Sequence, residues 1–422
     1  MAGALVFVSV QANAQGRVSD RIARVHDGVV HLQYDSRPGA CGDGRSMVSY
    51  RSAMFAKDFT GFGRMNDRRC VAGPVRVSLV VAGGRVTQLQ TQISGAWPSA
   101  GSPVTDVGIV PATEAVSYFI AHLGEMEAIG SRDRSLLPVV LADADVLAPL
   151  LTIARDDQHT TRTRRQAIQW LGLLGNASTV PALVSFTKGA TDPVDDSRDG
   201  ESLASSAASA LSMLDDAAGI PALMLLARNG STAVRRNAVF WLAQNGDARG
   251  LRVLHTVIED AKEDERVRKH AIFSLGNTDE VPTSEREYLR TMFSRLDSDA
   301  LKESVLQAMA NGHADNGAWL LARARDSRES MKVRKSALFW AGQGEATPTS
   351  DLVAAYRGVD DRTLQEQAIF VISQRDDDAA ITALMKIARE DPDAKMRGKA
   401  LFWLAQKHDP RATKLIGDLV LK

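Results

Sequence analysis

The sequence has little cysteine, few aromatic residues and no net charge. Its 422 residues include two cysteines, and aromatic residues make up 5%. Lys plus Arg and Asp plus Glu number 51 each, so the formal net charge is zero. A nucleic-acid-binding protein usually carries a basic excess, so this balance argues against a nucleic-acid partner. Beyond the first residues, no apolar run approaches the ~18 residues of a transmembrane helix. We therefore expect neither nucleic-acid binding nor a membrane span.

The motifs of common catalytic and metal sites are also missing. The sequence contains no Gly-rich phosphate loop, no HExxH, no G-x-S-x-G and no EF-hand pattern. The spacing of Cys41 and Cys70 does not suit a four-ligand zinc site, and no histidine cluster completes one. These absences predict a protein that is not an enzyme and has no metal or cofactor.

One catalytic alternative remains open. A hydrolase-like site, or an enzyme-associated subunit, could be built from acidic residues in two Gly- and Asp-rich segments. In the segment 38–73 the candidates are the acidic residues Asp43, Asp58 and Asp67 together with the basic Arg64, and the Asp-rich insert 191–200, with Asp195 and Asp196, is the other possible location.

The N-terminus is typical of the end of a secretory signal. Ala2 to Val10 is small and apolar, and Ala12-Asn13-Ala14 has the small-x-small form of a signal-peptidase site. No basic residue precedes the run, so an apolar N-terminus of the mature chain is the alternative. We expect residues 1–14 to be a signal-peptide remnant and the protein to be periplasmic or secreted. In an exported chain Cys41 and Cys70 would form a disulfide, whereas in the cytosol they would be separate thiols.

Residues 15–110 are predicted to form a β-rich domain. Val30, Leu32 and Tyr34 alternate with polar residues, as in a half-buried strand. Alternation over 75–81 and 88–93, with Gly83-Gly84 between, predicts a β-hairpin. The segment 38–73 is expected to be a long loop. Residues 111–142 are predicted to be a linker containing one helix over about 113–129.

Residues 143–422 contain a sustained repeat. One pattern recurs with a spacing of 31–34 residues and one interval of 40. Its fifth residue is small or β-branched: Ala167, Ala207, Ala238, Ala271, Val305, Ala337, Ala368 and Ala400. Each period holds two helical segments, and Ser, Thr or Asp precedes most of the second ones, as expected of helix N-caps. A single pair would leave its apolar arc exposed, so neighbouring pairs must stack. The fold class is therefore mostly α, a right-handed α-α superhelix of about eight helix pairs after a small β-rich domain.

The strongest copies of the pattern carry a resemblance to a known family. Val234 to Gln244, Val333 to Gln343 and Met396 to Gln406 read close to V-R-x-x-A-ϕ-F-W-L-x-Q. This text resembles bacterial HEAT-repeat proteins of the PBS-lyase type. The resemblance implies a HEAT-like solenoid and is nearly silent on function, because such arrays serve many roles. Since catalytic motifs are missing, we expect a scaffold of the cell envelope that binds a protein or peptide on the concave face of the solenoid. The resemblance also admits a bilin-lyase-like role as an alternative. A deoxyhypusine-hydroxylase-like di-iron site would require His-Glu dipeptides, and none of the eight histidines is followed by Glu.

The seventh residue of the pattern predicts a binding groove. On a helical wheel it lies about opposite the apolar arc, with amides and basic residues nearby, among them Arg236 and Lys335. The groove candidates are Phe240, Phe273, Phe339, Phe370, Phe402, Gln244, Gln343 and Gln406. The alternative is that each Phe packs between neighbouring helices. The next residue, Trp170, Trp241, Trp340 or Trp403, is predicted to lie in the core.

The second residue of the pattern is a recurring arginine. The members are Arg164, Arg235, Arg268, Arg334 and Arg397. Because this position lies inside the buried arc, we expect a structural ladder in which each Arg pairs with an Asp or a carbonyl of the adjacent repeat. A basic stripe that binds an acidic partner is the alternative.

Overall fold

The computed structural model describes ten segments of the chain, which form two compact units. The described residues are 17–45, 48–50, 53–55, 70–129, 135–188, 202–278, 281–311, 316–344, 347–407 and 409–420. Unit 1 comprises residues 1–189 and 195–219, and unit 2 comprises residues 190–194 and 220–422.

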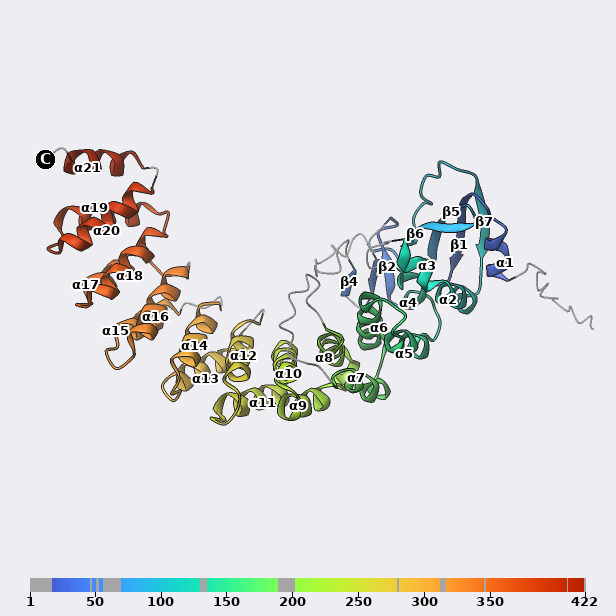
Figure 1. Cartoon of the computed structure of the whole chain (residues 1–422), viewed down its shortest axis with the longest axis horizontal. Helices are drawn as coiled ribbons and strands as arrows, with labels where there is room; N and C mark the ends of the chain where they lie inside the picture. The colour runs from blue at the N-terminus through green and yellow to red at the C-terminus, as the bar shows by residue number, and fades with distance from the viewer. Residues whose placement is uncertain are drawn as a thin grey trace, which may run out of the picture. The chain divides into compact units, whose positions relative to one another are not determined.

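Unit 1 begins with a four-stranded sheet in the order β6-β5-β1-β7 (Figure 1). The strands are β1 (Gly28–Tyr34), β5 (Val75–Ala82), β6 (Arg85–Ile93) and β7 (Val104–Ile109). β1 pairs antiparallel with β5 and parallel with β7. Gly83 and Gly84 have φ of 60° and 72°, the positive values that a two-residue hairpin turn requires. The predicted hairpin is confirmed.

One face of this sheet is apolar and fully buried. Val30, Leu32 and Tyr34 pair with Leu79, Val77 and Val75, and all six side chains are buried. The Tyr34 hydroxyl donates to the Pro138 carbonyl at 2.7 Å, which ties the end of β1 to a helix of the segment after the sheet. The alternating pattern of β1 therefore marks a core face, as predicted.

One short helix precedes strand β1, and three helices follow strand β7. The helices are α1 (Val18–Ala23), α2 (Ala112–Ala121), α3 (Leu123–Ala128) and α4 (Leu137–Val140). The predicted β-rich segment 15–110 thus also contains a helix, α1, ahead of β1. The single helix expected over 113–129 is broken at His122, whose φ and ψ of −109° and 16° are not helical. Phe119 and Leu123 on either side of this break are fully buried, so packing sets the kink.

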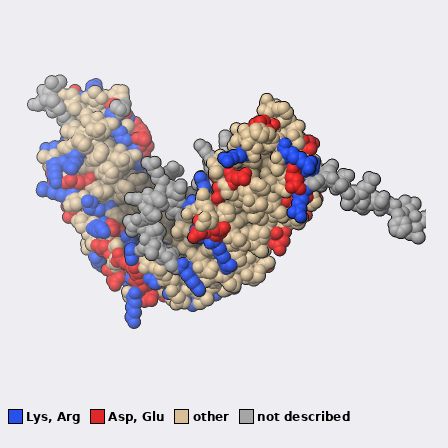
Figure 2. Space-filling model, turned by 45° about the vertical axis from the view of Figure 1, so that its right-hand side comes forward, with Lys and Arg blue, Asp and Glu red and all other residues tan. Residues whose placement is uncertain are grey.

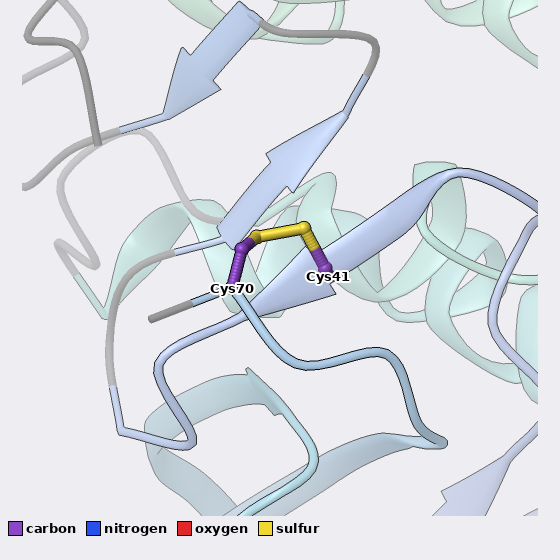
Figure 3. The surroundings of a disulfide bond; sticks show 2 residues. All are labelled: Cys41 and Cys70. Atoms are coloured by element: carbon purple, nitrogen blue, oxygen red, sulfur yellow. A yellow bond between two sulfur atoms is a disulfide. The ribbon is translucent and has the colours of Figure 1, made fainter. Parts of the chain in front are cut away.

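The segment expected to be a long loop contains a second sheet. Its strands are β2 (Ala40–Gly42), β3 (Val48–Tyr50) and β4 (Ala53–Phe55), in the order β2-β3-β4. The loop prediction is wrong here because three-residue strands are too short to show a period of two. The expected disulfide between Cys41 and Cys70 is present, with the two Cα atoms 5.2 Å apart (Figure 3). It joins β2 to the chain that leads into β5.

Helix pairs make up the rest of both units. Unit 1 contains α5 (Leu147–Arg155), α6 (Thr161–Leu174), α7 (Val180–Phe186) and α8 (Leu203–Met213). Unit 2 contains α9 (Ile220–Asn229), α10 (Thr232–Asn245), α11 (Ala248–Glu259), α12 (Glu265–Gly276), α13 (Thr283–Phe293), α14 (Asp299–Asn311), α15 (Gly317–Arg325), α16 (Met331–Gln343), α17 (Thr349–Arg357), α18 (Arg362–Ser373), α19 (Asp378–Glu390), α20 (Ala394–Ala405) and α21 (Pro410–Val420). Two pairs in unit 1 and six in unit 2 give the predicted eight within the described residues, and α21 follows the last pair.

Stacking in unit 2 follows the repeat. The second helices of successive pairs contact one another in the order α10, α12, α14, α16, α18 and α20. Within this unit they line the inner side of the curved array, and the first helices lie outside (Figure 1). Their starts are capped as predicted: the side chains of Ser231, Asp264, Ser330, Asp361 and Asp393 each accept a backbone N–H of the first turn.

A small residue at the tenth position of the repeat allows close approach of second helices. A Cβ built on Gly276 would lie 2.4 Å from the Cβ of Ala308 on α14, and one on Gly342 would lie 2.0 Å from a Val371 methyl on α18. At this tenth position every repeat has Gly, Ala or Ser.

None of the described helices has the length and apolar character needed to span a membrane.

Candidate functional site

The inner side of unit 2 carries a row of partly exposed phenylalanines. Phe240, Phe273, Phe339 and Phe370 are half-buried, and Phe402 is 56% exposed. Each ring thus packs partly between helices and leaves an edge at the surface, so the two interpretations of this position are not exclusive. α14 has Gln307 in place of Phe, which separates the pair on α10 and α12 from the three on α16, α18 and α20. We call this surface the second-helix face.

Tryptophans support the phenylalanine rings from the side. Phe240 and Trp241 meet edge-on with centroids 5.1 Å apart, and Phe339 and Trp340 do so at 5.2 Å. Trp403 contacts Phe402 at 5.1 Å and the preceding repeat's Phe370 at 5.4 Å. Three of these contacts are edge-on and the Phe370–Trp403 contact is tilted, both favourable arrangements for aromatic rings.

The prediction that the tryptophans are core residues is therefore wrong for three of them. Trp170 in unit 1 is 1% exposed, but Trp241, Trp340 and Trp403 are half-buried. The eighth position lies at the border of the apolar arc. On these helices the Trp side chain packs beside the neighbouring Phe and remains partly exposed.

A histidine bridges the first two phenylalanines. The His270 ring centroid lies 6.2 Å from that of Phe240 and 6.3 Å from that of Phe273. Burial, with a smaller contribution from the Arg236 charge, lowers the pKa of His270 to about 4. His270 is therefore neutral at physiological pH and belongs to the apolar part of the face.

This pKa shift makes unit 2 less stable in mild acid. Because the unfolded chain binds a proton near pH 6.5 and the folded chain only near pH 4, stability falls as the pH drops through that window. We expect His270 to contribute about 1–2 kcal/mol to the loss of unfolding free energy between pH 7.5 and pH 5. Urea unfolding of wild type and His270→Gln at both pH values measures the difference. An equal loss in the two proteins would contradict the assignment.

The amides of the predicted groove are exposed. Gln244 donates from Nε2 to the Asn277 carbonyl at 3.1 Å, which joins the ends of α10 and α12. Gln343 and Gln406 lie exposed at the ends of α16 and α20. These side chains can donate and accept hydrogen bonds at the rim of the face.

The recurring arginines bind carbonyls at the ends of first helices. Nε of Arg164, Arg268 and Arg334 donates to the carbonyls of Ala154, Ile258 and Ala324 at 3.0–3.1 Å. Unpaired carbonyls and the negative end of the helix dipole make this a favourable place for a cation. The acceptors belong to the same helix pair, whereas an acceptor in the adjacent repeat was expected.

Two of the arginines depart from this pattern. Arg235 donates to the Gly230 carbonyl at 3.2 Å and pairs with Glu263, which precedes α12, at 2.9 Å. Arg397 donates to the Asp391 carbonyl at 2.8 Å. All five arginines are thus engaged within the protein.

The residues of the catalytic alternative are not assembled into a site within the described segments. Asp43 accepts the Arg45 N–H at 2.9 Å, whereas Asp58, Arg64, Asp67 and the insert 191–200 lie outside the described residues. In the described part of the chain, no three His, Cys, Asp or Glu side chains are grouped to hold a metal ion.

Two surface depressions occur in unit 1. One, of about 420 Å³, is lined by Arg17, Glu114, Tyr118 and His122 among others, and Glu114 there accepts the Val18 N–H at 2.6 Å. Another, of about 500 Å³, is lined by residues that include Asp35, Pro74 and Ile109. Each has one carboxylate among its lining residues, Glu114 in the first and Asp35 in the second.

Cations accompany the phenylalanines on the second-helix face. Arg236, Lys269 and Lys335 each stand four residues before a phenylalanine of the row. Helical spacing places residues i and i+4 on the same side. Arg236 and Lys335 were expected beside the row from the sequence, and Lys269 occupies the same third position of the pattern in its own repeat.

The stacked pairs define an α-solenoid, and the comparison with protein families agrees. Residues 220–310 match the family described as HEAT repeats. This part of the chain is thus similar to HEAT repeats, and the remaining pairs of unit 2 continue the same stacking.

Comparisons with solved structures give distant similarities. Kap121p is 13% identical with a TM-score of 0.42, covering 70% of this chain and 37% of that one. Human deoxyhypusine hydroxylase is 17% identical with a TM-score of 0.26, covering 61% and 94%. The CpcE–CpcF complex of phycocyanin lyase from Nostoc sp. PCC7120 is 17% identical with a TM-score of 0.25, covering 66% and 96%. At these values the similarities carry no information on function. No curated protein matches the sequence.

Proposed function

We propose that this protein is a non-catalytic scaffold that binds a protein or an extended peptide through the second-helix face of unit 2. The observation that carries the proposal is the row of five partly exposed phenylalanines, four of which contact a tryptophan and one a histidine, with amides at the rim. Fixed aromatic anchors in a partly apolar surface are typical of binding hot spots.

We further propose that the protein works in an oxidising compartment of the cell envelope or outside the cell. The disulfide between Cys41 and Cys70 supports this location, because such bonds persist outside the reducing cytosol. Mass spectrometry of the native protein tests both the export of the chain and the presence of the disulfide. A mature chain that begins at Gln15 and has no free thiol is the expected result, and two free thiols would contradict it.

The binding proposal predicts that Phe240→Ser/Phe339→Ser/Phe402→Ser loses its partner. Each aromatic anchor of a protein interface commonly contributes about 2 kcal/mol or more, so we expect binding to fall at least about 100-fold. Quantitative pull-down from envelope extracts, with wild type and variant at equal folded concentration, measures the loss.

A matched control separates the face from general surface apolarity. Leu225→Ser removes a side chain that is 59% exposed on the first helix α9, away from the face. It should recover the same partners as wild type. Phe402→Ser alone tests the most exposed ring if the triple variant unfolds. If folded Phe variants recovered the same partners as wild type, the proposal that the second-helix face binds them would be contradicted.

A further inference from the structure

The charges on the second-helix face allow the partner's chemistry to be named. We propose that the face binds an acidic protein segment in which carboxylates stand next to apolar side chains. The inference rests on the proposed function and adds the class of partner to it.

Three cations on the face have no acidic partner within the described part of the chain. Arg236, Lys269 and Lys335 form no ion pair there. Arg236 and Lys335 are half-buried and Lys269 is exposed, so all three are accessible. Each stands one helical turn before Phe240, Phe273 or Phe339. A cation therefore accompanies a phenylalanine on α10, α12 and α16.

Acidic groups on the same position of other repeats are neutralised. Glu303 on α14 pairs with Lys332 at 2.7 Å. Glu366 on α18 pairs with Lys395 and, at 3.3 Å, with Lys399. The protein thus pairs the carboxylates of this face internally and leaves the cations open, which gives the face a local positive potential. A carboxylate brought by a partner would complete these pairs.

The cluster on α10 and α12 is the best-formed part of this surface. His270 links Phe240 and Phe273, and its neutral ring extends the apolar area between Arg236 and Lys269. An apolar partner side chain would contact the Phe and His rings while flanking carboxylates reach the two cations. A purely apolar partner would leave the two cations unpaired, and a purely acidic partner would leave the Phe and His rings uncovered.

An acidic protein segment fits this surface better than single-stranded nucleic acid. Nucleic acid needs a continuous basic groove and free aromatic faces for stacking. Here four of the five Phe rings contact Trp. On the side of the molecule displayed in Figure 2, basic and acidic residues are interspersed. The formal net charge of the chain is zero.

The test is selection of random peptides displayed on phage against the full chain. Wild type should enrich peptides with Asp or Glu next to Leu, Ile or an aromatic residue. Arg236→Glu/Lys269→Glu should lose these peptides and instead enrich Lys or Arg at the same places. For a peptide selected on wild type, fluorescence anisotropy should show at least about tenfold weaker binding to the double variant, because two attractive contacts become repulsive. Binding to wild type should also weaken with added salt.

A charge-matched control is available on the first-helix layer and the terminal helix. Arg252→Glu/Lys414→Glu makes the same change in net charge at exposed positions of α11 and α21 and should leave peptide binding unchanged. Enriched peptides that lack acidic residues but still require Phe240 would overturn the acidic partner and leave the proposed function standing. Peptides that bind the triple Phe variant equally well would overturn both. Preferential binding of labelled single-stranded RNA, competed by the peptides, would overturn the inference in favour of nucleic acid.

Discussion

Cys41→Ser/Cys70→Ser is expected to lower the stability of the N-terminal sheets of unit 1 by about 3–4 kcal/mol. The disulfide closes a loop with a sequence separation of 29 residues, and opening it restores the conformational entropy of that loop to the unfolded chain. The three-residue strands β2, β3 and β4 have few ladder hydrogen bonds to replace it. Hydrogen exchange resolved by peptide would show faster exchange in β2 and β5 first.

Unit 2 supplies the internal control for this experiment. Because its helices form a separate compact unit, exchange in α12 to α20 should be unchanged by the substitution. Reduction of the wild-type protein should reproduce the effect of the serine variant. Unchanged exchange in the sheets of the variant would show that the disulfide is not needed for their stability.

Gly276→Ala is expected to destabilise unit 2 by about 2 kcal/mol, although alanine is the better helix former. The new Cβ would lie 2.4 Å from the Ala308 Cβ and 2.6 Å from its Cα, so α12 and α14 would have to separate. The contact is with backbone, which cannot rotate away. Chemical denaturation followed by circular dichroism measures the loss.

Gly398→Ala is the matched control because the same substitution meets open space. Gly398 lies within α20 and no other atom would come within 4 Å of its new Cβ. Alanine should therefore stabilise this helix by about 0.5–1 kcal/mol through its higher helix propensity. A stabilising effect at both positions would contradict the close approach of α12 and α14.

The helix pairs, their capped starts and the β-hairpin could be predicted from the sequence because they depend on local periodicity. The spacing near 32 residues predicted the eight helix pairs, since each pair has an apolar arc that only a neighbour can cover. Ser231 and Asp264 marked helix starts because their side chains cap the first turn. The alternation in β1 and the Gly83-Gly84 turn predicted the hairpin sheet.

Other features could not be predicted because they depend on which surfaces meet. The strands β2 to β4 are too short to show a period, and the break at His122 follows from the burial of Phe119 and Leu123. The helical wheel placed Trp241 in the core, whereas in the packed array the ring is half-buried beside Phe240.

The sequence by itself determined that helices occur in pairs, where each pair begins, and which cysteines are available to join. These are properties of neighbouring residues and of repeat length. Only the tertiary structure decided that Arg268 binds the Ile258 carbonyl, that Gly276 touches Ala308, and that Arg236 and Lys269 remain without an acidic partner among the described residues. The physical reason is that a contact between two helices depends on their distance and relative rotation. Many packed side chains set this geometry together, so it cannot be read from any single residue of the repeat.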